Sequence, residues 1–172
     1  MFKKLLLIFL AGMLIFLYGC GRQSDSELMQ KAEALRETGE FQKAVTTYDI
    51  LQRIHPESPL RKEALLRAGL INLVRLGNRD QAASYFGRLS EEYPRTPLAE
   101  GAESLDHFLT TPAAEDTSEL LYRTGLAYTN LLQDYNAGIE LLESIPETSP
   151  DSKRAADALF MTGFILANSV RD

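Results

Sequence analysis

Apolar residues recur at spacings of three and four along most of the chain, which is the period of helices that bury one face. The first such stripe comprises Leu28, Ala32 and Leu35. It predicts a helix over residues 26–38. Ser24 and Glu27 have the spacing of a capping box, which satisfies free amides at a helix start. Gly39 is expected to end this helix in a left-handed backbone conformation.

Two segments further along the chain repeat one pattern. Residues 39–56 read GEFQKAVTTYDILQRIHP, and residues 77–94 read GNRDQAASYFGRLSEEYP. At a constant spacing of 38 residues, the matched pairs are Gly39 and Gly77, Ala44 and Ala82, Tyr48 and Phe86, and Pro56 and Pro94. A spacing kept by residues of four kinds indicates helical hairpins that stack and bury a shared core.

The 38-residue period breaks after Pro94 and resumes beyond an insertion, since Gly69 matches Gly125 at a spacing of 56 residues. The sequence therefore predicts an all-α solenoid of stacked helical hairpins with one inserted helix. The predicted units are hairpins over residues 26–56, 58–94 and 117–147, an extra helix over 97–110 and an unpaired last helix over 152–170. Ser58 and Thr96 each precede proline, which predicts a hydroxyl cap with proline at the first helical position.

The last predicted helix is apolar over a broad arc. Phe160, Phe164, Ile165 and Leu166 all lie on it, whereas a terminal capping helix normally has a polar outer face. We therefore expect that the chain is a truncated piece of a longer solenoid. The alternative is that this helix is itself the cap.

The first nineteen residues have the parts of an export signal. Lys3 and Lys4 precede an apolar run over residues 5–18, and a small residue stands before Cys20. As a helix the run is about 22 Å long, shorter than the bilayer core of about 30 Å, so a membrane span is the weaker interpretation. We assign residues 1–19 to a signal peptide, 20–25 to a short tether that begins with Cys20, and 26–172 to a helical-repeat domain.

The segment Leu17-Tyr18-Gly19-Cys20 resembles the lipobox of bacterial lipoproteins, although Tyr18 stands where a small or aliphatic residue is usual. The resemblance implies a diacylglyceryl thioether on Cys20, cleavage before it, and acylation of its new amino group by a chain such as palmitate. Gly21 stands where an aspartate would retain the protein at the inner membrane, which favours the outer membrane. The alternative is an ordinary signal peptide whose Cys20 is lost or buried.

Charge and cysteine content narrow the classes of partner. The formal net charge is −6, and removal of Lys3 and Lys4 with the signal peptide makes it −8. Nucleic acid is a poor candidate partner because its phosphates need a concentrated basic surface. Cys20 is the only cysteine, so no disulfide can form within the chain.

The hairpin pattern resembles the tetratricopeptide repeat, whose second helix carries alanine, an aromatic residue and a closing proline in that order. The matching residues are Gly39, Phe41, Ala44, Tyr48 and Pro56 in the first unit, and Gly77, Ala82, Phe86 and Pro94 in the second. The third unit departs from this pattern: Gln133 replaces the turn glycine, Gly138 the alanine and Leu142 the aromatic residue. The fold class implied is a tetratricopeptide-like α-solenoid.

The repeat end Tyr-Pro-x-Thr-Pro-x-Ala, here residues 93–99, together with a lipobox resembles the lipoprotein component of the outer-membrane β-barrel assembly machinery and related periplasmic repeat lipoproteins. This resemblance implies a rigid superhelix that binds partners and has no chemistry of its own. The expected partners are envelope proteins or peptides. The expected contact with the membrane is through the lipid anchor, and no small-molecule substrate is expected.

In tetratricopeptide proteins the first helix of each unit lines a concave face. The resemblance places Arg67, Arg75, Arg123 and Asn130 at ligand-facing positions of these helices. Three guanidinium groups along a groove would suit a peptide that carries carboxylates. The alternative is that they are solvated arginines whose stems cover apolar neighbours.

Residues suited to catalysis are sparse. His55 and His107 are 52 positions apart and no cysteine is near either, so surface or packing roles are favoured over metal binding. The adjacent acids Glu91-Glu92 and Glu115-Asp116 are interpreted as solvated charges, and no glycine-rich loop has phosphate-binding spacing. We predict no catalytic residue, metal or cofactor.

The leading hypothesis is a lipid-anchored periplasmic scaffold at the outer membrane that binds envelope proteins, with a role in outer-membrane protein assembly. The second is a cell-wall or division adaptor of the same architecture. The third, an envelope hydrolase, needs a cluster of acid, base or nucleophile that the sequence does not show.

Overall fold

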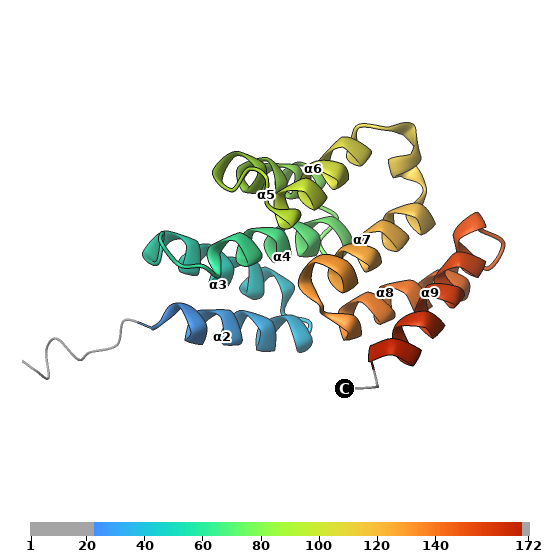
Figure 1. Ribbon diagram of the computed structural model, residues 1–172, viewed down its shortest axis with the longest axis horizontal. Helices are drawn as coiled ribbons and strands as arrows, with labels where there is room; N and C mark the ends of the chain where they lie inside the picture. Colours follow the sequence, from blue (N-terminus) through green and yellow to red (C-terminus); the bar gives the residue numbers. More distant parts are fainter. Residues whose placement is uncertain (1–22, 170–172) are drawn as a thin grey trace, which may run out of the picture.

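A computed structural model describes residues 23–169 of the chain, as eight α-helices and one short 3-10 helix (Figure 1). In chain order these are α2 (Asp25–Glu37), α3 (Phe41–Ile54), α4 (Arg61–Val74), α5 (Arg79–Glu92), α6 (Pro97–Leu109), η1 (Pro112–Glu115), α7 (Thr117–Leu132), α8 (Tyr135–Thr148) and α9 (Lys153–Ser169). This described part contains no strand, which confirms the all-α prediction. The predicted signal peptide and Cys20 lie outside the described residues.

The first hairpin, α2 and α3, forms as its local sequence predicts. The Ser24 hydroxyl accepts a hydrogen bond from the Glu27 amide at 3.2 Å, and the Ser24 amide donates to the Glu27 carboxylate at 2.8 Å. Gly39 has a φ of 78°, a left-handed conformation that reverses the chain toward α3. The predicted capping box and glycine turn are confirmed.

The second hairpin, α4 and α5, starts differently from the prediction. Helix α4 begins at Arg61, and Ser58 lies in a turn before it, closed by a 3.2 Å hydrogen bond from the Arg61 amide to the Ser58 carbonyl. The Ser58 hydroxyl donates to the Asp25 carboxylate at 2.6 Å, so this side chain connects the turn to α2. The Ser58 hydroxyl also accepts a hydrogen bond from the Leu60 amide at 3.1 Å, but this amide lies before the helix. The predicted cap with Pro59 at the first helical position is therefore wrong for α4, which begins at Arg61.

Helix α6 is the inserted helix, and here the prediction of a cap is confirmed. The Thr96 hydroxyl accepts a hydrogen bond from the Ala99 amide at 3.3 Å, and Pro97 occupies the first helical position, where its missing N–H costs no hydrogen bond. The short helix η1 then connects α6 to α7.

The third hairpin, α7 and α8, uses other residues for the same geometry. Gln133 has a φ of 54°, so it adopts the left-handed conformation that Gly39 and Gly77 adopt in the earlier units. Gly125 and Gly138 bring the two helices together, since a Cβ on Gly138 would lie 2.9 Å from the Gly125 carbonyl oxygen. Glycine in place of the repeat alanine therefore leaves room for this close contact between α7 and α8.

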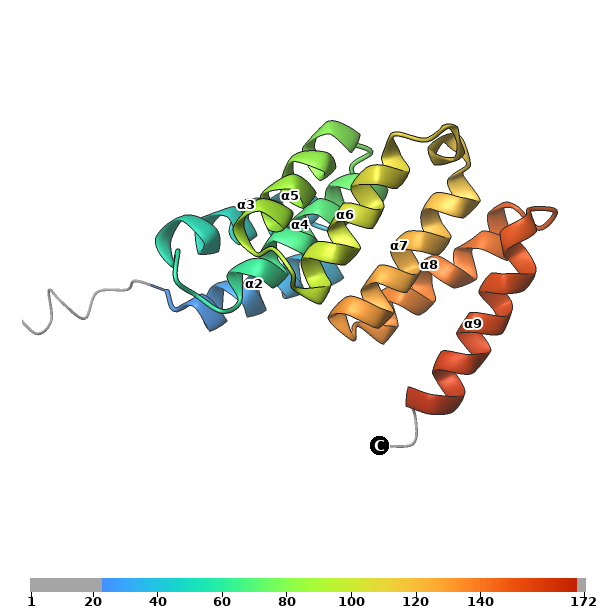
Figure 2. The same cartoon turned by 45° about the horizontal axis from the view of Figure 1, so that its top comes forward.

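The shared core follows the repeat positions. The alanines Ala44 and Ala82 and the aromatic residues Tyr48 and Phe86 are 0% exposed, and so is Leu142, which takes the aromatic position in the third unit. The hairpins follow one another from α2 at one end to α9 at the other (Figures 1 and 2). None of the described helices has both the length and the apolar character that a membrane crossing requires.

Candidate functional site

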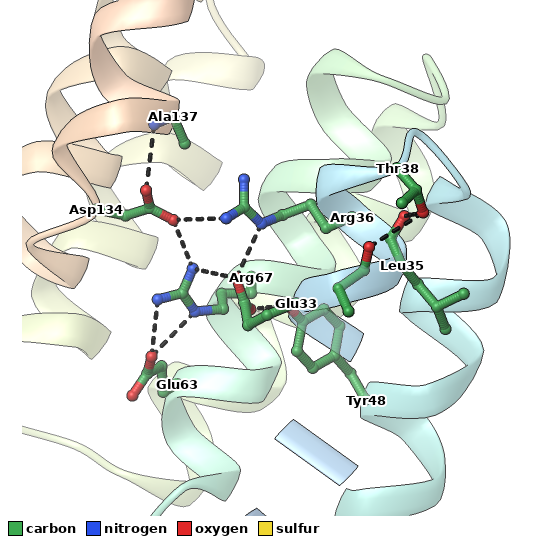
Figure 3. Close-up of polar contacts among 10 residues, drawn as sticks. Glu33, Leu35, Arg36, Thr38, Tyr48, Glu63, Arg67, Asp134 and Ala137 are labelled. Carbon is green, nitrogen blue, oxygen red and sulfur yellow. Dashed lines mark hydrogen bonds and ion pairs between the residues drawn. The ribbon is translucent and has the colours of Figure 1, made fainter. Parts of the chain in front are cut away.

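A group of ion pairs around the buried Arg67 side chain, the Arg67 network, joins the three hairpins (Figure 3). The Arg67 side chain on α4 is 9% exposed. Its guanidinium contacts the carboxylates of Glu63 at 2.9 Å, Glu33 at 3.2 Å and Asp134 at 2.9 Å. Arg36 also contacts Glu33 at 2.9 Å and Asp134 at 3.0 Å. Because these residues come from α2, α4 and the start of α8, the network connects units that are far apart in the sequence.

Local structure orients the members of the network. Asp134 is the N-cap of α8: one carboxylate oxygen accepts a hydrogen bond from the Ala137 amide at 3.1 Å, and the other faces Arg67. Tyr48 of α3, the aromatic position of the first repeat, donates a hydrogen bond to Glu33. The capping position and the repeat core therefore hold both acids toward the arginine.

Charge pairing and hydrogen bonds together have a larger effect than burial on the pKa values of Asp134 and Arg67 in this network. Burial acts to raise the pKa of Asp134, but hydrogen bonds from Arg67 and a backbone amide, with the charge of Arg36, hold that pKa below its ordinary value. Burial likewise acts to lower the pKa of Arg67, and the charge of Glu33 contributes to raising it above its ordinary value. Burial and Glu33 raise the pKa of Tyr48. Arg67 and Asp134 are thus charged at neutral pH, and the network is a structural cross-link.

A cavity of about 520 Å³ opens beside the network, between the α2–α3 turn, the end of α4 and the start of α8. Its lining includes Arg36, Gly39, Phe41, Arg75, Tyr128 and Glu140. Cationic, acidic and aromatic groups from three hairpins therefore share one wall. We call this space the α2–α4–α8 cavity.

Arg75 directly follows the last residue of α4 and lines this cavity. The contacts that hold its side chain there are weak. Its guanidinium lies 2.7 Å from a carboxylate oxygen of Glu140 and 5.4 Å from the centre of the Phe41 ring. The Arg75 side chain is 27% exposed and that of Glu140 is 62% exposed, so their ion pair contributes little to stability. A carboxylate from a partner can replace Glu140 while the ring continues to support the guanidinium.

Tyr128 of α7 also lines this cavity. The residue is buried, and burial raises the pKa of its phenol to about 12. The hydroxyl is therefore neutral at physiological pH and can donate or accept a hydrogen bond.

The four residues predicted to face one groove lie in three different places. Arg67 is buried in its network, so the prediction that it faces an open groove is wrong: acidic side chains from α2, α4 and the start of α8 surround it. Arg75 lines the α2–α4–α8 cavity. Arg123 and Asn130 line a separate cavity of about 250 Å³ between α6 and α7.

Arg123 has the packing role that was the alternative to binding. Its guanidinium lies 2.7 Å from Glu119, one turn earlier on α7, and 4.5 Å from the centre of the Phe108 ring on α6. The inserted helix α6 thus covers this part of α7. Arg75 is the predicted site residue that the structure places in the larger cavity.

Glu33, Asp134 and Glu140 belong to the site although the sequence does not mark them. Asp134 is 67 positions from Arg67, and no local spacing predicts contact over that distance. One local signal was present: Asp134 follows Gln133, the residue in place of the turn glycine, and aspartate is a favoured N-cap. That signal predicts the cap but does not predict the ion pairs.

Of the residues considered for catalysis, His55 and Asp116 have structural contacts. A ring nitrogen of His55 lies 2.8 Å from a backbone carbonyl oxygen just before α2, and His107 is exposed in the last turn of α6. Asp116 caps α7, so its carboxylate has a structural role. Glu115 pairs with Arg79 at 2.7 Å, but its side chain is 81% exposed, which agrees with the interpretation as a solvated charge. Over residues 23–169, no three side chains of His, Cys, Asp or Glu are grouped so as to hold a metal ion.

Comparison with known proteins gives one family match. A family model described as tetratricopeptide repeat matches residues 28–58, 63–96 and 119–152, which together make up more than half of the chain. The matched segments correspond to the three hairpins and leave out α6, as expected for an insertion. Comparison with curated proteins and with solved structures found no match.

Proposed function

The chain belongs to the tetratricopeptide repeat family, whose repeats bind proteins, and we propose that it is a non-enzymatic scaffold anchored by lipid on Cys20. In this proposal the scaffold lies on the periplasmic side of the outer membrane and binds envelope proteins that take part in outer-membrane protein assembly. The α2–α4–α8 cavity is the surface on which we place the partner.

The lipobox-like segment that ends at Cys20 supports the anchor. Helix α2 begins at Asp25, five positions after Cys20. Five extended residues span at most about 18 Å, so lipid on Cys20 would hold the repeats close to the bilayer surface. A scaffold in this position can bind a membrane-embedded partner without a long tether.

We predict that the chain is processed as a lipoprotein. Cells treated with globomycin, which blocks lipoprotein signal cleavage, should accumulate a longer precursor, and labelled palmitate should appear in the mature chain. Cys20→Ser should abolish the label because it removes the thiolate that accepts the lipid. An unchanged chain size under globomycin, or a label that survives Cys20→Ser, would contradict the anchor.

The binding proposal rests on one observation, the environment of the Arg75 guanidinium. Its cation lies in the α2–α4–α8 cavity, supported by the Phe41 ring, and its ion-pair partner among the described residues is the exposed carboxylate of Glu140. Guanidinium groups bind carboxylates through two parallel hydrogen bonds. The fitting partner is therefore a protein segment with an exposed carboxylate, either a C-terminus or an acidic side chain.

The assembly role is tested by purifying the full-length chain from detergent-solubilised envelopes. We expect a subunit of the β-barrel assembly machinery to co-purify. The matched control is Cys20→Ser, which we expect to co-purify less of that subunit because it is not held at the membrane. Recovery of cell-wall enzymes alone would contradict the assembly role and favour the cell-wall adaptor.

A further inference from the structure

Helix α9 lies at one end of the stack (Figure 2), and one of its faces is exposed and apolar. Four large side chains on it are 45–70% exposed: Leu159, Phe160, Phe164 and Leu166. The rings of Phe160 and Phe164 stack, with centroids 6.4 Å apart. Clustered apolar side chains of this size on a protein surface indicate an interaction site.

The opposite face of α9 is already covered. Ala155, Ala158, Thr162 and Ile165 are buried where α9 packs on α8 and α7. Residues 158–169 include no charged side chain, so α9 is apolar or neutral on both faces over this length. A helix of this kind is normally buried on both sides. The exposed face is therefore suited to a second layer of packing.

Gly163 lies in the middle of the exposed face, and the space beside its Cα is open. At the matching position of the second hairpin, a Cβ on Gly69 would lie 2.5 Å from the ring of Phe86, and in the third hairpin a Cβ on Gly125 would lie 3.0 Å from Leu142. A Cβ on Gly163 would have no atom within 4 Å. In the second and third hairpins, a large side chain packs against the glycine at this helix position. On α9 the space beside the matching glycine is open.

We propose that α9 is a dimerisation helix and that a second copy of this chain covers its exposed face. Phe160 and Gly163 are three positions apart and lie on the same side of the helix. In an antiparallel pair of α9 helices, Phe160 of each copy therefore lies opposite Gly163 of the other. The large side chain and the open position needed for packing are both present on one helix.

The rest of the face has the same twofold pattern. The alignment that places Phe160 opposite Gly163 also places Ala156 opposite Ala167, so small residues let the helices approach on both sides of the centre. At one edge, Leu159 lies near Leu166 of the other copy. Such a self-complementary surface gives a closed dimer, because each copy uses the same residues and no further copy can add.

The size of this surface predicts a weak dimer. One helix face on each copy is small compared with the interfaces of stable dimers, which bury about 800 Å² on each partner. We therefore expect monomers and dimers in exchange. Anchoring both copies in one membrane would raise their effective concentration and favour the dimer.

Site-directed cross-linking of the full-length chain tests this arrangement. In a Cys20→Ser background, the double variant Ala156→Cys with Ala167→Cys should form covalent dimers with a short bismaleimide linker. Each single variant should form few, because its two thiols would be about 16 Å apart along the helix pair. Both positions are exposed, so the substitutions leave the core intact. Absence of dimers from the double variant, or equal yields from the single variants, would overturn the proposal.

A second variant separates dimerisation from folding. Gly163→Leu in the double-cysteine background should lower the cross-linked yield about tenfold, because it closes the position that receives Phe160. The fold should be retained, since that position is open and leucine favours helix more than glycine does. The matched control is Ala34→Leu, at an exposed position of α2. If Gly163→Leu keeps the same yield as Ala34→Leu, Phe160 of one copy does not pack over Gly163 of the other, and the proposed arrangement is overturned.

Discussion

Replacing Arg67 by methionine should lower the free energy of unfolding by about 3–5 kcal/mol. Methionine keeps the apolar stem but removes the cation that contacts Glu33, Glu63 and Asp134. The acids then remain partly buried without their main partner, and that penalty is larger than the net value of the ion pairs themselves. For a domain with a stability of about 5–15 kcal/mol, this loss is a large fraction of the total.

Urea unfolding followed by far-ultraviolet circular dichroism measures the Arg67 effect. The matched control is Arg53→Met on an exposed position of α3, which should change stability by less than about 0.5 kcal/mol. Adding Asp134→Asn to Arg67→Met should recover part of the loss, because without Arg67 the carboxylates of Glu33 and Asp134 share the single cation of Arg36 and the second change removes one of them. Equal effects of Arg67→Met and Arg53→Met would show that the network does not hold the hairpins together.

Phe86→Ala should lower the free energy of unfolding by about 3–5 kcal/mol. Phe86 is 0% exposed and occupies the aromatic position of the second repeat, with its ring packed over Gly69 of the preceding helix. Its removal leaves a cavity at the contact between α4 and α5, and the flanking hairpins limit how far that cavity can close. Thermal or urea unfolding of the variant measures the loss.

The contact of Phe86 with Gly69 predicts that the two positions are coupled. Gly69→Ala alone should destabilise by about 1–3 kcal/mol, because its Cβ would lie 2.5 Å from the buried ring. In the Phe86→Ala background the same change should stabilise by about 1 kcal/mol, since alanine favours helix and the ring is gone. Gly87→Ala, where a Cβ has no atom within 4 Å, is the control for helix propensity. Additive effects of the Gly69 and Phe86 changes would contradict this packing.

The features of the fold that were predictable depend on short-range spacing. Glycine, alanine, aromatic and proline positions recur at 38 residues, and the structure places Gly39 and Gly77 in left-handed turns and Tyr48 and Phe86 in the core. Even Gln133 could be assigned to the turn from its register alone. Such positions are predictable because each repeat imposes the same backbone conformation and the same buried neighbour.

The site was less predictable because it depends on contacts between repeats. Register places Arg67 on the inner face of its helix, but whether that face is open depends on Glu33 and Asp134, which lie far away in the sequence. In the same way, the Ser58 hydroxyl accepts a hydrogen bond from the local Leu60 amide and also donates one to Asp25 of the earlier helix. Local preference does not predict the second partner, because that tertiary contact exists only in the assembled stack.

We propose that Arg75 binds a carboxylate of an envelope partner, and the most direct measurement compares two arginine variants of the full-length, membrane-anchored chain. Arg75→Ala should lower recovery of the co-purified assembly subunit about tenfold, the loss expected for one charge-assisted contact. The exposed variant Arg53→Ala should recover as much as the unchanged chain, and both should remain folded and anchored. Equal recovery by Arg75→Ala and Arg53→Ala would contradict the account.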